Sequence, residues 1–133
     1  MRSAALSIFG ALLLATACGG EAAPSVSPSP SPSGGPVPSE LAGTWTQVAD
    51  HPFTLNLTGT SYTIFHPEKE GAGDVVVNGS EIDFFNAVMS GCYDVGRYKW
   101  QVSTGLLLFT DTNSDTCTRA AVLRDSKGWR RSP

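Results

Sequence analysis

The chain has 133 residues, of which 41% are hydrophobic and 16% are charged, and its formal net charge is −3. This length suits a single domain. The mild acidity does not provide the basic face that nucleic-acid binding requires, so we expect no nucleic-acid partner, and no apolar run reaches the ~18 residues of a membrane-spanning helix.

Residues 1–17 have the pattern of an export signal. Arg2 supplies a positive charge, an apolar run covers residues 4–15, and small residues precede Cys18. A short apolar run with a small-residue exit is typical of a cleaved signal peptide rather than of an anchor. The string Leu-Ala-Thr-Ala-Cys at 14–18 also resembles a bacterial lipobox, in which Cys18 receives the lipid, although Ala15 stands where that motif usually has leucine.

The chain contains three cysteines, and this odd number favours lipidation of Cys18. Export leads to an oxidising compartment where cysteines pair, and three cysteines cannot all pair within one chain. Lipidation of Cys18 leaves Cys92 and Cys117 as an even pair. The alternatives are an incidental signal-peptide cysteine or a free thiol at the mature N-terminus. We therefore expect a lipid anchor in the membrane and a location at the extracytoplasmic face.

The segment after Cys18 reads as a spacer. Residues 19–39 contain six prolines, six serines and four glycines. Such a composition cannot bury a core and is typical of disorder, and its Pro-Ser repeat favours an extended chain. We expect a disordered spacer over 18–39 that holds a domain, residues 40–133, away from the membrane surface.

Residues 40–133 have the alternation of apolar and polar residues that is typical of half-buried β-strands. Turn residues separate the alternating runs at 58–61, 78–80 and 103–105, and Asn-Gly at 78–79 is a strong hairpin signal. Short, sequential strands predict an all-β fold, a small antiparallel up-and-down barrel of about eight strands, in which closure removes the sheet edges. The expected strands are 43–48, 53–57, 61–65, 74–78, 81–85, 96–102, 106–110 and 119–124, with 127–131 as a ninth candidate.

Hairpin arithmetic predicts which cysteines and histidines meet. A turn at 104–105 places Trp100 opposite Phe109 and, further along, Cys92 opposite Cys117, within the reach of a disulfide. A three-residue loop would shift the register by one and leave the cysteines adjacent. A two-residue turn at 58–59 would place His51 opposite His66, where a transition metal is an outside possibility; a four-residue loop would separate them. We favour rim histidines and expect no metal.

The two ends of this domain resemble lipocalins and their calycin relatives. Leu-Ala-Gly-Thr-Trp at 41–45 is similar to the Gly-x-Trp opening of the first lipocalin strand, and the segments 92–100 and 115–131 resemble short lipocalin-like domains of exported actinobacterial proteins. The resemblance implies that Gly43 and Trp45 close one barrel end, with a C-terminal basic side chain against the indole. Arg131 and Arg130 are ranked above Arg119, because the last strand lies beside the first in a closed barrel.

The family resemblance also implies a function, a small hydrophobic ligand held outside the cytoplasm by a monomer. The inward candidates are Phe53, Leu55, Tyr62, Ile64, Phe84, Tyr98 and Trp100. The alternative is a protein-binding envelope module with a filled barrel, such as an inhibitor of a lysozyme-type hydrolase. Catalysis needs a convergent acid, base or nucleophile, and with two histidines and no nucleophile elbow we expect neither an enzyme nor a cofactor. Asp111, Asn113 and Asp115 copy the start of a calcium loop, but the pattern breaks at Thr116, so we favour a polar loop.

Overall fold

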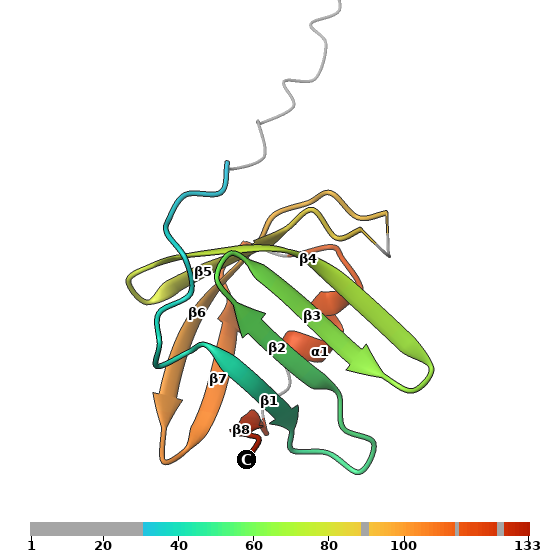
Figure 1. Cartoon of the computed structure of the whole chain (residues 1–133). Coiled ribbons are helices and arrows are strands. Elements are labelled where there is room, and N and C mark those ends of the chain that lie inside the picture. The colour runs from blue at the N-terminus through green and yellow to red at the C-terminus, as the bar shows by residue number, and fades with distance from the viewer. Residues whose placement is uncertain (1–30, 89–90, 114, 125–126) are drawn as a thin grey trace, which may run out of the picture.

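The computed structural model describes residues 31–88, 91–113, 115–124 and 127–133. Within these residues the chain is all-β, and eight antiparallel strands close into a barrel in which each strand pairs with its neighbours in sequence and β8 pairs with β1 (Figure 1). The expected fold class, a small up-and-down barrel, is therefore confirmed.

The bounds of the strands are β1 Gly43–Gln47, β2 Thr54–Thr58, β3 Ser61–His66, β4 Lys69–Asn78, β5 Glu81–Phe85, β6 Gly96–Ser103, β7 Leu106–Asp111 and β8 Trp129–Arg131, with a helix α1, Arg119–Leu123, before β8. Tight turns join β2 to β3, β3 to β4, β4 to β5 and β6 to β7, whereas the other connections are longer.

The register of the β6–β7 hairpin is the predicted one, whereas that of the β2–β3 hairpin is not. Trp100 lies opposite Phe109. In the β2–β3 hairpin, Leu55 pairs with Ile64, so the turn is at Gly59-Thr60, one residue later than expected. Gly59 adopts a φ of 59°, which glycine tolerates far better than the preceding threonine. Of the two alternatives that the sequence left open, the register that places His51 opposite His66 is therefore not the one that forms.

The segment 119–124 was expected to be a strand and is instead the short helix α1. Arg119, Ala120 and Leu123 are its buried residues, a spacing that a helix presents on one face. An apolar run of this length fits a strand and a helix equally well, and periodicity does not separate them. The closing strand is β8, inside the ninth candidate range 127–131.

The strand β4 begins at Lys69 rather than near residue 74. Its first half lacks apolar alternation because charged and glycine residues occupy it. Gly73 explains part of this composition, since a Cβ at that position would lie 2.5 Å from the carbonyl oxygen of Phe85 and 2.7 Å from Tyr62. The Tyr62 ring of β3 and the backbone at the end of β5 approach β4 so closely in this region that only glycine fits there.

The folded domain begins before residue 40, where the expected spacer was to end. Gly35 exchanges two backbone hydrogen bonds of 2.9 Å with Val77, and the amide of Val37 donates to the carbonyl of Gly59 at 2.7 Å. Val37 and Leu41 are buried in the core cluster. The segment 35–41 thus packs against the barrel and belongs to the domain, which the boundary at residue 40 missed.

Side chains fill the middle of the barrel. Phe84 makes edge-to-face contacts with Tyr62, Tyr98 and Phe109, with ring centroids 5.0 to 5.8 Å apart, an arrangement that aromatic rings favour. Leu55 and Leu107 are fully buried beside them. The interior is therefore a packed core, as expected for a small barrel of eight strands.

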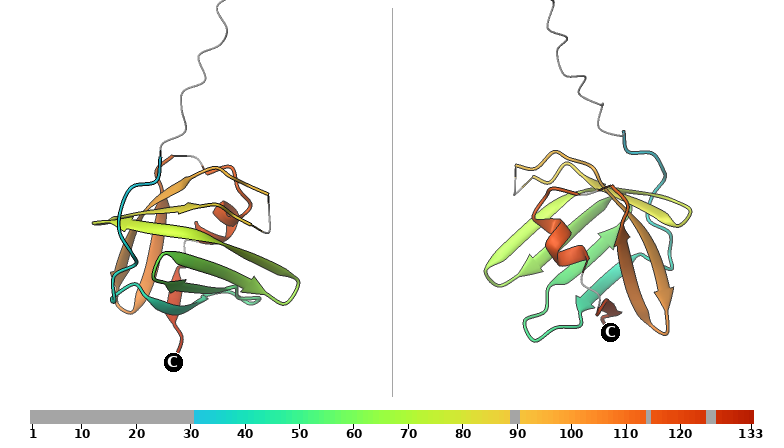
Figure 2. Two further views of the ribbon diagram at one scale, coloured as in Figure 1. Left: turned by 45° about the horizontal axis from the view of Figure 1, so that its top comes forward. Right: turned by 180° about the vertical axis from the view of Figure 1, so that it is seen from behind.

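The helix α1 crosses one side of the barrel. The right-hand view of Figure 2 shows this helix in front of the strands. Among the described residues, no helix is long and apolar enough to cross a membrane.

Candidate functional site

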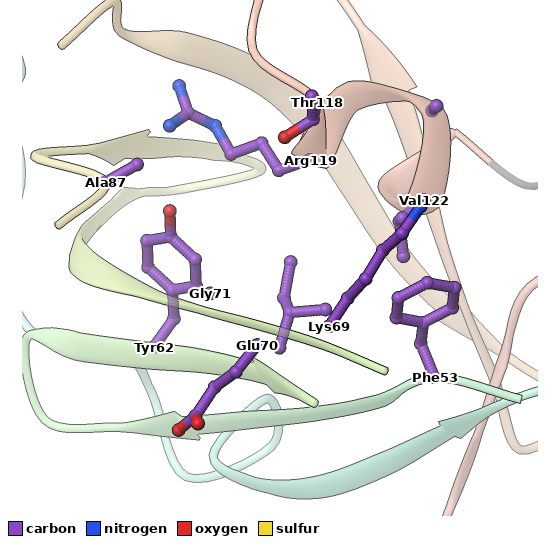
Figure 3. A pocket seen from close by; sticks show the side chains of 11 residues that line it. Phe53, Tyr62, Lys69, Glu70, Gly71, Ala87, Thr118, Arg119 and Val122 are labelled. Atoms are coloured by element: carbon purple, nitrogen blue, oxygen red, sulfur yellow. The ribbon is translucent and has the colours of Figure 1, made fainter. Parts of the chain in front are cut away.

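A pocket of about 310 Å³ lies between α1 and the strands β3 and β4 (Figure 3). This volume is at the lower end of the range for small-molecule sites. Its walls come from the segment before β2, from β3 and β4, and from the helix. The lining residues are Phe53, Tyr62, Ile64, Lys69, Glu70, Gly71, Ala87, Thr118, Arg119, Ala121 and Val122.

Only some of the residues expected to line a ligand site do so. Phe53, Tyr62 and Ile64 line the pocket. Leu55, Phe84 and Tyr98 are fully buried in the packed core. Trp100 is partly buried against that core, and its indole donates a hydrogen bond of 3.1 Å to the carbonyl of Gly79. The space is thus beside the core, under the helix, rather than at the centre of the barrel.

The two ends of the pocket differ in burial and polarity. Phe53 and Val122 are partly buried and Lys69 is exposed, so these residues mark the mouth. Tyr62, Ala87 and Arg119 are buried and mark the inner end. In Figure 3 the hydroxyl of Tyr62 points toward the guanidinium of Arg119, while Lys69 extends toward Val122.

A buried ion pair forms the polar wall of the inner end. The side chains of Arg119 and Asp115 are 5% and 0% exposed, and the Nε of Arg119 donates to a carboxylate oxygen of Asp115 at 2.9 Å. The same oxygen accepts a hydrogen bond of 2.6 Å from the hydroxyl of Tyr98, and the other accepts one of 3.0 Å from the amide of Cys117. Asp115 is therefore well satisfied, as a buried carboxylate must be.

The contacts with Asp115 and Asp94 do not involve every nitrogen of the Arg119 guanidinium. Its Nη2 donates to the carbonyl of Asp94 at 2.6 Å and to Asp115 at 3.3 Å. Its Nη1 is buried and finds no hydrogen-bond partner among the described residues. Buried donors in folded proteins nearly always have partners, so this nitrogen is an unusual feature of the pocket wall.

Burial changes the pKa values of the two tyrosines beside this wall. Burial raises the pKa of Tyr62, and the positive charge of Arg119 together with hydrogen bonding from its side chain acts in the opposite direction. Burial also raises the pKa of Tyr98, reinforced by the hydrogen bond to Asp115. Both phenols therefore stay protonated, and both can donate hydrogen bonds at neutral pH.

The disulfide between Cys92 and Cys117 fastens the segment before α1 to the connection between β5 and β6. Its Cα atoms are 5.8 Å apart, as the hairpin arithmetic predicted. Cys117 is two residues before Arg119, so the bond helps to fix the helix over the pocket. The lipidation expected at Cys18 lies outside the described residues.

At the β1–β8 junction, Trp45 is 1% exposed. The guanidinium of Arg131 lies over the indole, 4.5 Å from its centroid, and Arg131 pairs with Trp45 across the junction. Gly43 is positioned beside Arg131, since a Cβ there would lie 3.1 Å from its Nη1. Arg131 is thus the arginine that stacks on Trp45, while Arg130 pairs with Thr46 and Arg119 belongs to the pocket.

The histidines do not form the metal arrangement that the sequence left open. The ring of His66 packs against that of Phe53, with centroids 4.8 Å apart, and His51 lies exposed before β2. Within the described parts of the chain, no group of three or more His, Cys, Asp or Glu side chains is placed to hold a metal ion. Asn113, in the calcium-like segment, instead accepts a hydrogen bond of 2.8 Å from the backbone amide of Arg97 through its side-chain oxygen.

Sequence reasoning named Asp115 and Arg119 in other roles, and it missed their ion pair and the helix that carries Arg119. Asp115 precedes α1, which begins at Arg119, so the rule for ion pairs four residues apart on a helix does not apply and the sequence offered no clear signal for this pair. Comparison with models of protein families, with characterised proteins and with solved structures finds no match for this chain.

Proposed function

We propose that this chain is a lipid-anchored, lipocalin-like protein that binds a small hydrophobic ligand outside the cytoplasm. The observation that carries the proposal is the pocket of about 310 Å³ under α1, with Phe53, Ile64 and Val122 on its walls. A concave, largely apolar site with a few polar groups is the usual form of a small-molecule site.

The sequence supports the cellular part of the proposal. The export signal at 1–17 and the lipobox-like string ending at Cys18 indicate an extracytoplasmic anchor. The disulfide is in keeping with an oxidising compartment. The Gly-x-Trp opening and the arginine stacked on Trp45 support the lipocalin-like assignment.

The test is ligand capture by the chain from residue 19 onward, which contains every strand of the barrel. A fluorescent fatty-acid probe should brighten on binding, and apolar competitors should displace it. Val122→Trp fills the pocket and should abolish the signal. Val102→Trp is the matched control, because Val102 is 42% exposed on β6 and does not line the pocket. Equal binding by both variants, or no binding by the parent chain, contradicts the proposal.

A second candidate is a protein-binding envelope module such as a lysozyme-type hydrolase inhibitor. The observation that favours it is the pair of exposed apolar side chains between β5 and β6, with Val88 76% and Tyr93 79% exposed. Exposed aromatic residues are typical anchors of protein interfaces. Inhibition of a lysozyme by the parent chain, lost in Tyr93→Ala and retained in Val122→Trp, would support this candidate instead.

A further inference from the structure

We propose that the inner end of the pocket under α1 recognises a carboxylate, so that the ligand is an aliphatic monocarboxylate whose chain runs toward the mouth. This inference rests on the proposed ligand-binding function and specifies the chemistry of the ligand. It starts from the buried Nη1 of Arg119, which has no hydrogen-bond partner among the described residues.

The donor set at the inner end suits an anionic oxygen. The Nη1 of Arg119 is a donor. The Tyr62 hydroxyl points toward this guanidinium in Figure 3 and acts as an acceptor toward Arg119, so its own proton is available to an acceptor bound beside it. The Arg119 side chain is 5% exposed, so an acceptor placed there would be shielded from water. Hydrogen bonds from a charged donor to a charged acceptor are about twice as strong as those between neutral groups.

The donor is held in place before any ligand arrives. Asp115 and the carbonyl of Asp94 hold Nε and Nη2 of Arg119, which fixes the plane of the guanidinium. A Cβ at Gly96 would lie 2.1 Å from the Asp115 carboxylate, so that carboxylate sits directly against the β6 backbone. A donor fixed in this way loses little conformational entropy on binding.

The rest of the pocket suits an apolar chain. Ile64, Phe53 and Val122 lead from the inner end to the mouth. Lys69 is at the mouth and could attract an anion there, whereas the carboxylate of Glu70 points away from Arg119 in Figure 3. The opposite orientation, with the carboxylate beside Lys69, would press an apolar chain against the buried Nη1 and leave it without an acceptor.

The experiment compares decanoate with methyl decanoate and decanol by calorimetry at neutral pH, again with the chain from residue 19 onward. Decanoate should bind roughly tenfold or more tightly than the two neutral compounds, as expected for a charge-assisted hydrogen bond. Arg119→Lys keeps a cation beside Asp115 but removes Nη1. This variant should bind decanoate and methyl decanoate with nearly equal affinity. Tyr62→Phe should reduce the preference severalfold without abolishing it.

Lys69→Met separates the two orientations, and Lys99→Met, on the exposed side of β6, is its matched control. Both variants should keep the preference for decanoate. Loss of the preference in Lys69→Met with retention in Tyr62→Phe would overturn the inner-end assignment. If a thermal melt shows that Arg119→Lys is not folded, Tyr62→Phe and Lys69→Met still distinguish the two orientations of the ligand.

The outcomes distinguish this inference from the proposed function. Equal affinity for decanoate, ester and alcohol would overturn carboxylate recognition while ligand binding stands. No binding of any of the three compounds would overturn both.

Discussion

Single residues in this chain hold several parts of the structure together, and Asp115 is the clearest case. Its buried carboxylate accepts from Tyr98, Arg119 and the amide of Cys117. Removing one member of a buried ion pair leaves the other uncompensated, which costs about 3–5 kcal/mol. The same pair orients Arg119 beside the pocket, so stability and the ligand recognition proposed above would depend on the same contacts.

The buried tyrosines predict a loss of stability in alkali. The pKa values of Tyr62 and Tyr98 are raised in the folded chain above the ordinary value of 10.0. Between the unfolded and the folded pKa, the unfolded state binds fewer protons than the folded state, so the free energy of unfolding falls as the pH rises above about 10. Below that pH the contribution of these groups is fully present.

This prediction is checked by following tyrosinate absorbance and circular dichroism together in Tyr93→Phe, in which only Tyr62 and Tyr98 can ionise. Ionisation and unfolding should coincide in this variant. Ionisation of both phenols at the ordinary tyrosine pKa with the barrel intact would contradict the burial argument.

Trp45 should carry a large share of the stability of the barrel. Its indole is buried, donates a hydrogen bond of 2.9 Å to the carbonyl of Leu41, and is covered by Arg131. Trp45→Ala should lower the free energy of unfolding by about 3–5 kcal/mol, as large-to-small core substitutions do, measured by denaturant titration. Trp100→Ala, at a partly buried position, is the control and should cost clearly less.

At the scale of elements, strands could be predicted where the apolar–polar alternation and the turn residues indicated the same pairing register. Trp100 and Val102 face Phe109 and Leu107 across a turn whose Gly105 has a φ of 79°, and both signals specify one register. The segment 119–124 offered a short apolar run without a distinguishing period, so the helix depends on tertiary contacts. The pocket could not be predicted, because it exists only where that helix crosses β3 and β4.

The disulfide should stabilise the domain and hold α1 in place. It joins cysteines 25 residues apart, and closing such a loop contributes about 3 kcal/mol in the chain-entropy model. The double substitution of Cys92 and Cys117 by serine should lower the free energy of unfolding by about that amount. Reductant should then have no further effect. Unchanged stability of the double variant would mean that this connection contributes little.

The described part of the molecule is a barrel, and its first residues wrap back over the strands. Gly35 and Val37 bond to Val77 and Gly59, so the segment preceding β1 is attached to the domain before the chain continues toward residue 30 and below. Any tether to a surface therefore pulls first on this segment and not on β1. The composition of residues 19–34, rich in proline, serine and glycine, suits the remaining length to act as a spacer.

The last prediction concerns the attachment itself. The lipobox-like string, the odd cysteine and the spacer predict that Cys18 carries the lipid, which would hold the pocket near the membrane. Wild-type chain should partition with membranes and detergent, and Cys18→Ala should release it or leave the precursor uncleaved. Cys92→Ala tests whether loss of another cysteine has the same effect; because it breaks the disulfide, it should disturb folding while leaving membrane attachment intact. Mass spectrometry of the mature N-terminus decides the question directly, since a free thiol at Cys18, or cleavage beyond it, contradicts lipidation and would leave the barrel as a released protein.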